Sequence, residues 1–467
     1  MAKASKVNVS CPSGFPEFLP GEKRLEVYLM DKIRDVFERY GFTPIETPAV
    51  ERLEVLQAKG NQGDNIVYGL HPILPPNRQV EKDEAGDSSS EDRALKFDQI
   101  VPLAAYIARH LNEIHFPFCR YQMDIVFRGE RAKDGRYRQF RQCDIDVVGR
   151  EKLNLLYDAQ IPAIIAEIFQ SINIGDFLIR INNRKVLAGF FQAISVDPEN
   201  IIECIRIIDA AEKIGLEKVK KALLELGLSQ QQTEQVLAFT QIRGSAEEIL
   251  AQLRALIPSE DAIAFQTGID ELETVIAGVR SLGVSDTSFC IDLSIARGLD
   301  YYTGTVYETT LVGHESLGSI CSGGRYENLV GMFVGQKMPG VGISIGLTRL
   351  MSRLLKAGIL QPLPPTPVQV AIINMQTDLM PLYLEVSQQL RRAGISAIAN
   401  FEARPLGKQL QQADKRGIPF CAIIGSEEAE AKTCGLKNLT TGQQIEVALA
   451  DLPTTIHQQL AEISMHQ

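Results

Sequence analysis

The residues best suited to chemistry lie in a few short stretches, and the densest of these is basic. Residues 127–142 read FRGERAKDGRYRQFRQ, with six basic side chains and with Gly135 as the expected turn between two strand-like arms. Arg128 suits a phosphate or carboxylate, because a guanidinium can donate two parallel hydrogen bonds to either group. The other arginines suit a phosphodiester backbone. A solvated, charged hairpin has the same composition, so this stretch alone leaves both interpretations open.

A second stretch, residues 295–308, reads IARGLDYYTGTVYE. Its arginine, Arg297, could neutralise a phosphoryl group during transfer, and Tyr301 and Tyr302 could hold a planar polar ligand. The alternative is an ordinary strand end with aromatic packing. The stretch therefore favours ligand binding only when it is combined with other motifs.

Two glycine-rich stretches follow. Residues 321–326 (CSGGRY) carry a glycine pair that would let the backbone approach a ligand closely, or would simply form a tight turn. Residues 340–349 (GVGISIGLTR) predict a glycine-spaced strand that runs into a helix carrying Arg349. This second string is neither a Walker-type phosphate loop nor a dinucleotide fingerprint, because both of those have a different spacing.

The elements that must position these residues follow from hydrophobic spacing and turn residues. The pattern predicts helices over 22–40 and 155–170, an extended stretch over 43–48, and strands over 177–182, 288–294 and 303–312. Beyond the linker it predicts a strand, helix, strand, helix, strand succession over 368–373, 379–392, 395–399, 406–416 and 420–424, which is typical of a small α/β domain.

Composition changes along the chain predict its domains. Residues 1–185 and 285–357 are expected to form one core, interrupted by a mostly helical module over 186–284. Four prolines make 358–367 a stiff linker to the α/β domain of residues 368–467. The polar segment 74–92 is expected to be a mobile surface insertion without chemistry of its own.

The bulk properties narrow the class of protein. The chain has 467 residues, 45% of them hydrophobic, with no apolar run long enough to span a bilayer. Its eight cysteines are scattered, without a C-x-x-C pair, which argues for reduced thiols and against a structural zinc site. The net charge of −10 means that any site for a polyanion must be a local basic patch.

Together, the motifs resemble those of class II aminoacyl-tRNA synthetases, and specifically the histidyl family. The family's dimer-interface motif resembles the segment from Glu22 to Pro48, and its F-R-x-E motif matches Phe127, Arg128 and Glu130. Its third motif matches Gly340, Gly342, Gly346 and Arg349. R-G-L-D-Y-Y and S-G-G-R-Y, both peculiar to histidyl enzymes, match 297–302 and 322–326, and residues 406–415 resemble the anticodon-binding domain.

The resemblance implies an α+β fold: an antiparallel sheet of six or seven strands flanked by helices, a helical insertion, and a C-terminal α/β anticodon-binding domain. It also implies a cytoplasmic homodimer that is a histidine–tRNA ligase. Such an enzyme uses ATP with Mg²⁺ to make histidyl-adenylate and pyrophosphate, and then transfers histidine to the 3′ end of tRNA(His). No protein-built metal site is expected, because the Mg²⁺ arrives with ATP.

The resemblance also assigns site residues by position. Arg128 and Arg297 would bracket the α-phosphate and carboxylate as catalytic residues, Arg349 would hold the γ-phosphate, and Glu130 would contact adenine or Mg²⁺-bound groups. Arg131, Lys133 and Arg136 would contact the tRNA acceptor end. The expected histidine-binding residues are Asp98, Gln99, Ile100, Arg128, Gln142, Asp146, Arg297, Tyr301, Tyr302 and Tyr326.

One position departs from the family. Histidyl enzymes usually carry threonine where this chain has Ile100, and that threonine helps the neighbouring acid, here Asp98, to bind the ammonium of histidine. Isoleucine cannot accept a hydrogen bond. Either histidine binds more weakly, or Asp98 and Gln142 hold the ammonium and Ile100 merely packs.

Two other functions are compatible with parts of the sequence. A non-catalytic paralogue, like the regulatory subunit of a short ATP phosphoribosyltransferase, would share the fold, but such paralogues commonly lose the arginine that Arg297 matches and the anticodon domain. A pure RNA-binding module would use the basic hairpin but would have no need for Arg297 or Arg349. Histidine-dependent exchange of pyrophosphate into ATP would distinguish both from the enzyme.

Overall fold

The structure is a computed structural model that describes residues 7–58, 66–70, 92–131, 135–256, 262–296, 298 and 302–465. The chain divides into two compact units. One consists of residues 1–17 and 28–360, and the other of residues 18–27 and 361–467. The expected surface insertion 74–92 lies outside the described residues, apart from Asp92.

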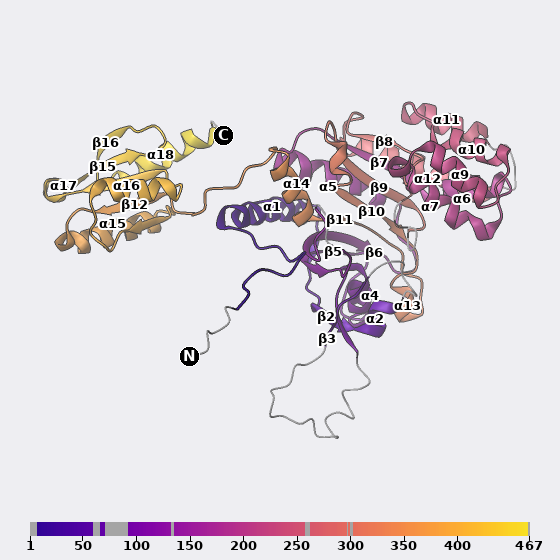
Figure 1. Ribbon diagram of the computed structural model, residues 1–467, viewed down its shortest axis with the longest axis horizontal. Coiled ribbons are helices and arrows are strands. Elements are labelled where there is room, and N and C mark those ends of the chain that lie inside the picture. The colour runs from indigo at the N-terminus through magenta and orange to yellow at the C-terminus, as the bar shows by residue number, and fades with distance from the viewer. Residues whose placement is uncertain are drawn as a thin grey trace, which may run out of the picture. The chain divides into compact units, whose positions relative to one another are not determined.

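An eight-stranded sheet forms the framework of the first unit (Figure 1), in the order β1-β5-β6-β11-β10-β9-β7-β8. The six inner strands pair antiparallel, whereas β1 and β8 join the two edges in parallel. The sequence predicts extended segments over 43–48 and 288–294, which contain β1 and β8, but not their parallel pairing, because that pairing depends on chain crossovers rather than on local pattern. The strands are β1 Thr43–Pro44, β5 Phe118–Phe127, β6 Gln139–Val148, β7 Phe177–Asn183, β8 Phe289–Ile291, β9 Thr305–Leu311, β10 Cys321–Tyr326 and β11 Gly340–Ile345.

One face of this sheet is apolar and is covered by two helices, α1 (Pro20–Arg39) and α5 (Leu156–Ile172). The ring of Phe37 lies 5.8 Å from that of Tyr121 on β5. The hydroxyl of Tyr307 on β9 donates to the backbone oxygen of Asp158 in α5, over 2.8 Å. Buried on this face are three residues of β6, Cys143, Ile145 and Val147. Because side chains alternate along a strand, the residues between them point toward the opposite face of the sheet.

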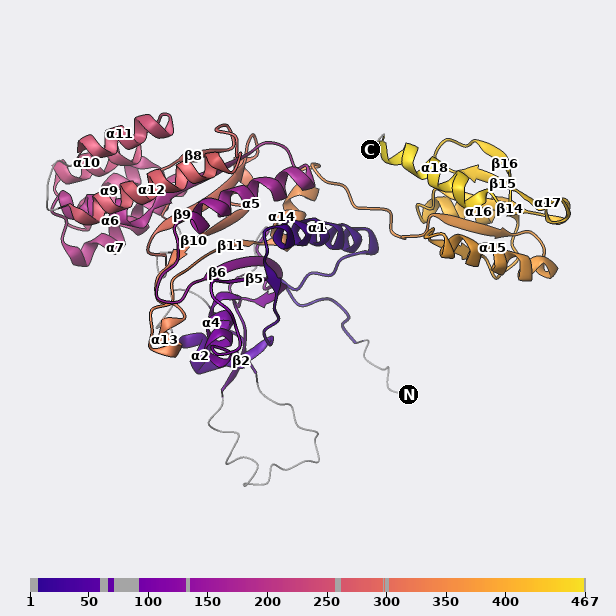
Figure 2. The same cartoon turned by 180° about the vertical axis from the view of Figure 1, so that it is seen from behind.

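A run of helices, α6 to α12, gathers beside β7 and β8 (Figures 1 and 2), as the sequence predicts for residues 186–284. The first and last of these helices pack closely, since a Cβ on Gly189 would lie 2.6 Å from the Cα of Phe265 and therefore cannot be accommodated. The helices are α6 Arg184–Ala193, α7 Ile201–Asp209, α8 Ala211–Ile214, α9 Leu216–Glu225, α10 Gln230–Thr240, α11 Ala246–Leu256 and α12 Ile263–Ser281.

Smaller elements of the first unit frame the site. A three-stranded sheet, in the order β2-β4-β3, leads into α4, and α14 directly follows β11. These elements are β2 Val50–Arg52, α2 Leu53–Gln57, β3 Gly69–Leu70, β4 Arg93–Leu95, α4 Ile100–Arg109, α13 Gly331–Val334 and α14 Leu347–Lys356. No helix among the described residues combines the length and the hydropathy that a bilayer crossing requires.

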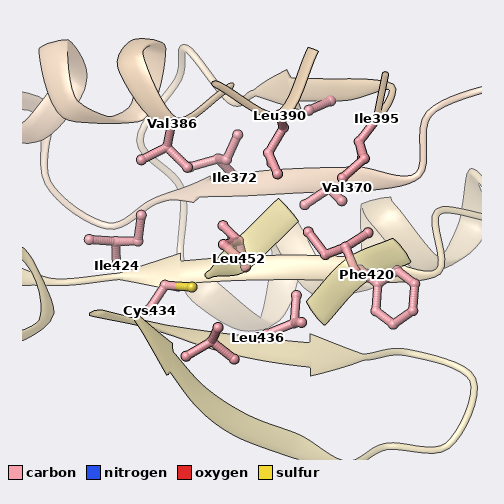
Figure 3. Packing of buried hydrophobic residues seen from close by; sticks show 14 of the residues in the cluster. Val370, Ile372, Val386, Leu390, Ile395, Phe420, Ile424, Cys434, Leu436 and Leu452 are labelled. Carbon is pink, nitrogen blue, oxygen red and sulfur yellow. The ribbon is translucent and has the colours of Figure 1, made fainter. Parts of the chain in front are cut away.

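The second unit has a five-stranded sheet in the order β13-β12-β14-β15-β16, of which the first three strands are parallel. Val370 and Ile372 of β12 pack toward α15 and α18 in the cluster shown in Figure 3. Ala371 and Ile373 pack toward α16 on the other face. The elements are β12 Val370–Asn374, α15 Met380–Arg392, β13 Ala397–Ala399, α16 Leu406–Lys415, β14 Phe420–Ile424, α17 Ser426–Ala431, β15 Thr433–Asn438, β16 Gln444–Ala448 and α18 Leu452–Met465.

Candidate active site

The polar face of the large sheet carries the candidate site. Along β6, Gln142, Asp144 and Asp146 alternate with the buried apolar residues. In the register of the sheet, Asp144 lies between Gln122 of β5 and Ser344 of β11. Neighbouring residues on that face are therefore polar on three adjacent strands, which suits a small polar ligand.

Asp146 is held at the buried end of this row. The guanidinium of Arg120 donates to its Oδ2 over 2.5 Å, and the hydroxyl of Tyr326 donates to its Oδ1 over 3.0 Å. Burial raises the pKa of Asp146 to about 6, and the charge of Arg120 opposes that shift. A carboxyl group with two fixed neighbours can orient a ring N–H of a ligand.

Asp144 is the more strongly perturbed carboxyl group. Burial raises its pKa to about 7, against the opposing charge of Arg120 and a hydrogen bond from Ser344; Asp146 and Asp98 raise it further. Its Oδ1 has no hydrogen-bond partner among the described residues. A buried carboxyl oxygen without a donor can accept a hydrogen bond from a ligand ammonium.

The two glutamines of the site have different roles. Gln142 donates from Nε2 to the hydroxyl of Ser344 over 2.7 Å and lines a cavity. Gln99 is fully buried, and its amide donates to the backbone oxygens of Asp124 (3.2 Å) and Gln142 (3.1 Å). Gln99 therefore joins β5 to β6 and does not line the cavity.

The cavity has a volume of about 1050 Å³ and lies beside this polar row. Its wall holds seven arginines and four carboxylates, in a chain of net charge −10. These arginines form the local basic patch that a chain of negative net charge needs in order to bind a polyanion. The predicted site residues that line it are Arg128, Glu130, Arg131, Arg136, Gln142, Tyr302 and Arg349.

Other predicted site residues lie elsewhere. Five are not part of the cavity wall: Asp98, Gln99, Ile100, Asp146 and Tyr326. Asp98 and Ile100 lie at the start of α4, where Oδ1 of Asp98 accepts from the backbone N–H of Val101 over 3.1 Å. Arg297, Tyr301 and Lys133 lie outside the described residues.

Arg128 is positioned by the strands on either side of it. Its Nε donates to the backbone oxygen of Phe97 over 3.0 Å, and its guanidinium carbon lies 5.1 Å from the centre of the Phe140 ring. The cation–π contact and the hydrogen bond fix the side chain without neutralising it. Arg128 can thus meet an anionic group in the cavity in a preset orientation.

The S-G-G-R-Y stretch is a strand, β10, rather than a tight turn or a loop that approaches a ligand. A Cβ on Gly323 would lie 2.1 Å from the backbone oxygen of Gly342, and one on Gly324 would lie 2.9 Å from the ring of Tyr302. Packing inside the sheet explains these glycines. Arg325 points to the buried carboxylate of Asp158, with Nε 3.0 Å from Oδ1.

Sequence reasoning missed the opposite end of the cavity. There Arg180 of β7 donates from Nε to Oδ2 of Asp292 over 2.8 Å, and Glu308 lies 3.6 Å from Arg180. Arg243, from the loop after α10, reaches Oδ1 of Asp292 at 3.6 Å. One signal was available, since a charged residue within the apolar FLIRINN strand needs a buried partner. The partner itself is distant in sequence.

Comparison with known proteins agrees with this geometry. The family model described as "Histidyl-tRNA synthetase" matches residues 86–350, and "Anticodon binding domain" matches residues 369–459. A relative from a Nostoc species, named histidine–tRNA ligase, is 69% identical over 98% of this chain and 100% of its own length.

Solved structures give the same result. The crystal structure of histidyl-tRNA synthetase from Nostoc has a TM-score of 0.89 and 65% identity, covering 97% of this chain and all of that one. A Bacillus halodurans structure, titled as an ATP phosphoribosyltransferase regulatory subunit/histidyl-tRNA synthetase, has a TM-score of 0.71 at 17% identity. It covers 87% of this chain and 97% of its own, and it shows a shared fold only.

Proposed function

We infer that this chain, which belongs to the histidyl-tRNA synthetase family, is an enzyme that activates histidine with ATP and transfers it to tRNA(His). The observation that carries this inference is the arginine-lined cavity beside the polar row of Gln142, Asp144 and Asp146. A regulatory paralogue is not favoured, because relatives named as ligases match nearly the whole chain at 67–69% identity.

In the first step, a carboxylate oxygen of histidine attacks the α-phosphorus of ATP, and the bond to the bridging oxygen of pyrophosphate breaks. Charge builds up on the α-phosphate oxygens, so a fixed cation aimed at them lowers the barrier. Arg128 is positioned for this role by Phe97 and Phe140. Arg297 would meet the same phosphate from the other side, and Arg349 would hold the γ-phosphate.

Recognition of histidine requires polar partners for its imidazole, because an apolar pocket discriminates poorly. We assign this role to Asp146, which is oriented by Arg120 and Tyr326, together with Tyr301 and Tyr302. Gln142 and Asp98 would bind the carboxylate and ammonium. Gln99 supports them by holding β5 and β6 together, and Ile100 borders them at the start of α4.

Magnesium would enter with the phosphates of ATP. Among the described residues, no group of three His, Cys, Asp or Glu side chains is placed to hold a metal ion by itself. The cavity nevertheless offers single carboxylates, including Glu130, and hard oxygen donors of this kind suit Mg²⁺ that already carries phosphate ligands. Bound in this way, Mg²⁺ would neutralise part of the charge on the leaving pyrophosphate.

In the second step, the terminal ribose hydroxyl of tRNA attacks the histidyl carbonyl carbon, and AMP leaves. Arg131, Lys133 and Arg136 would contact the acceptor end, and the domain of residues 368–467 would contact the anticodon. Residues 1–185 and 285–357 would form the catalytic core and 186–284 its insertion, joined by the linker 358–367. We further propose a homodimer, assembled through the α1–β1 segment, in the cytoplasm.

Pyrophosphate exchange tests this function. The purified protein should exchange labelled pyrophosphate into ATP with histidine and with no other standard amino acid. Arg128→Gln should lower the exchange rate roughly 10²–10³-fold, the usual loss when one fixed donor to a transition-state charge is removed. Exchange that does not depend on histidine would refute the assignment.

A further inference from the structure

Several guanidinium groups face one end of the cavity. Arg349 and Arg353 are four residues apart on α14 and therefore lie on the same helix face, and Arg136 comes from the loop between β5 and β6. All three line the cavity. Within the described ranges, neither Arg136 nor Arg353 forms an ion pair with a carboxylate.

Arg353 has a shielded donor that is available to a ligand. It is half-buried, and its Nη1 is shielded from solvent without a hydrogen-bond partner among the described residues. A Cβ placed on Gly318 would lie 3.6 Å from Nη1 of Arg353 and 3.7 Å from Nη2 of Arg349. Both guanidinium ends thus meet at the loop that follows Glu315–Leu317.

This arrangement is electrostatically unfavourable in the unliganded protein. Burial and the nearby charge of Arg136 both lower the pKa of Arg353. Positive charges that lie close together in a partly desolvated cavity wall repel one another and raise the free energy of the folded protein, unless an anion binds between them. At the other end of the cavity Arg180 and Arg243 are paired with Asp292, whereas Arg136 and Arg353 form no ion pair with a carboxylate among the described residues.

We propose that Arg353 is a further substrate-binding residue, which together with Arg349 binds the β- and γ-phosphates of ATP and the pyrophosphate that leaves. The proposal rests on the proposed function. When the bond between the α-phosphorus and the bridging oxygen breaks, its electron pair stays on pyrophosphate. Arg353 neutralises that added charge while the histidine carboxylate forms the new bond to phosphorus.

A purely structural role for Arg353 makes a different prediction. A Cβ on Gly135 would lie 2.8 Å from Nε of Arg353, and the hydroxyl of Tyr137 lies 2.8 Å from that of Ser352. The side chain could therefore act only as a support for the loop. Methionine preserves much of the aliphatic stem but removes the charge, whereas lysine preserves the charge.

The experiment measures pyrophosphate exchange for wild type, Arg353→Met, Arg353→Lys and the control Lys356→Met, on the same helix but outside the cavity wall. Arg353→Met should raise the KM for ATP and the KM for inorganic pyrophosphate about tenfold or more, since hydrogen bonds to charged groups contribute about 1.5–3 kcal/mol. The KM for histidine should stay within about twofold, Arg353→Lys should recover most of the loss, and Lys356→Met should match wild type.

Unchanged ATP and pyrophosphate constants in Arg353→Met would overturn the proposal. Equal losses in the Met and Lys variants, with a lower Tm and a raised histidine KM, would also overturn it and would show that Arg353 only supports the loop. Both results differ from failure of the proposed function, in which wild type itself would show no histidine-dependent exchange.

Discussion

At the residue scale, Ile100 is the position that departs from the family, and the structure shows what surrounds it. Ile100 is the first residue of α4, and its side chain packs against two apolar clusters, one that includes Leu103 and one that includes Val101. Asp98, two residues earlier, already accepts the Val101 N–H. The position therefore combines helix packing with proximity to the group assigned to the substrate ammonium.

Ile100→Thr should lower the KM for histidine several-fold and leave the KM for ATP nearly unchanged. The added hydroxyl can accept a hydrogen bond from the ammonium, worth about 1.5–3 kcal/mol. Steady-state exchange kinetics measure both constants. Ile114→Thr is the matched control, because Ile114 packs against the same cluster as Leu103 beyond the other end of α4. An unchanged histidine KM would show that Ile100 only packs.

At the element scale, β11 must pass close to β6 for the polar row to form. A Cβ on Gly342 would lie 2.3 Å from Oδ1 of Asp146 and 2.3 Å from the backbone oxygen of Ile145. At Gly346 the nearest atom would be 4.0 Å away. A Cβ on Gly340 would lie 2.4 Å from the ring of Tyr326, so two of the three glycines of this motif are required by packing and Gly346 is not.

Gly342→Ala should lower the Tm by several degrees and abolish exchange, because backbone must move to relieve the clash and such overpacking costs about 1–3 kcal/mol. Gly346→Ala should retain a near-wild-type Tm. Thermal unfolding and exchange assays compare the two variants. A tolerated Gly342→Ala would mean that β6 and β11 can separate without loss of the site.

The carboxyl row of β6 should also make stability depend on pH. In the unliganded protein the pKa of Asp144 is raised to about 7, above its usual value near 4. Between these values the folded state binds more protons than the unfolded state, so the contribution of this group to stability is full below about pH 4 and falls as the pH rises above that value. The contribution is lost as pH rises toward about 7.

Asp144→Asn should therefore raise the Tm of the unliganded enzyme at pH 8 more than at pH 5. The amide avoids the cost of ionising a buried group and can still accept the hydrogen bond from Ser344. Scanning calorimetry at the two pH values measures the difference. Equal Tm changes at both would show that Asp144 is ionised throughout this range.

At the scale of the whole molecule, the two units have different proposed roles. The described motif residues of activation lie in the first unit, whereas the anticodon-binding family matches residues 369–459 in the second. The second unit has its own cores on both faces of its sheet, so it is expected to fold by itself.

Removing residues 361–467 should leave histidine-dependent exchange within a few-fold of the full chain and lower tRNA charging by at least tenfold. Activation uses only small substrates, whereas charging also needs the tRNA to bind. Exchange and aminoacylation assays on one preparation measure both steps, and the Tm of the truncated chain controls for misfolding. Normal charging would refute the anticodon-binding role of the second unit.

The sequence by itself determined the family, the order of motifs and most regular elements. It did so because these depend on local information: hydrophobic period gave α1 and β12, and short motifs marked Arg128 and Arg349. It also placed the helical segment and the strand, helix, strand alternation after the linker. The segments of β1 and β8 were predicted as extended, but their parallel pairing was not, since their partners Arg120 and Arg180 are distant along the chain.

Only the tertiary structure decided which side chains share the cavity. Arg180 and Arg243 are more than sixty residues apart, and both reach Asp292 because β7, β8 and the loop after α10 converge there. Gln99 resembled a ligand-binding residue, but its amide binds the backbone of β5 and β6 and it does not line the cavity; Gly323 is explained by strand packing. Arg353 matched no motif. Its place beside Arg349 follows from the helical repeat, and Gly135 and Gly318, which are distant along the chain, both lie close to its guanidinium group.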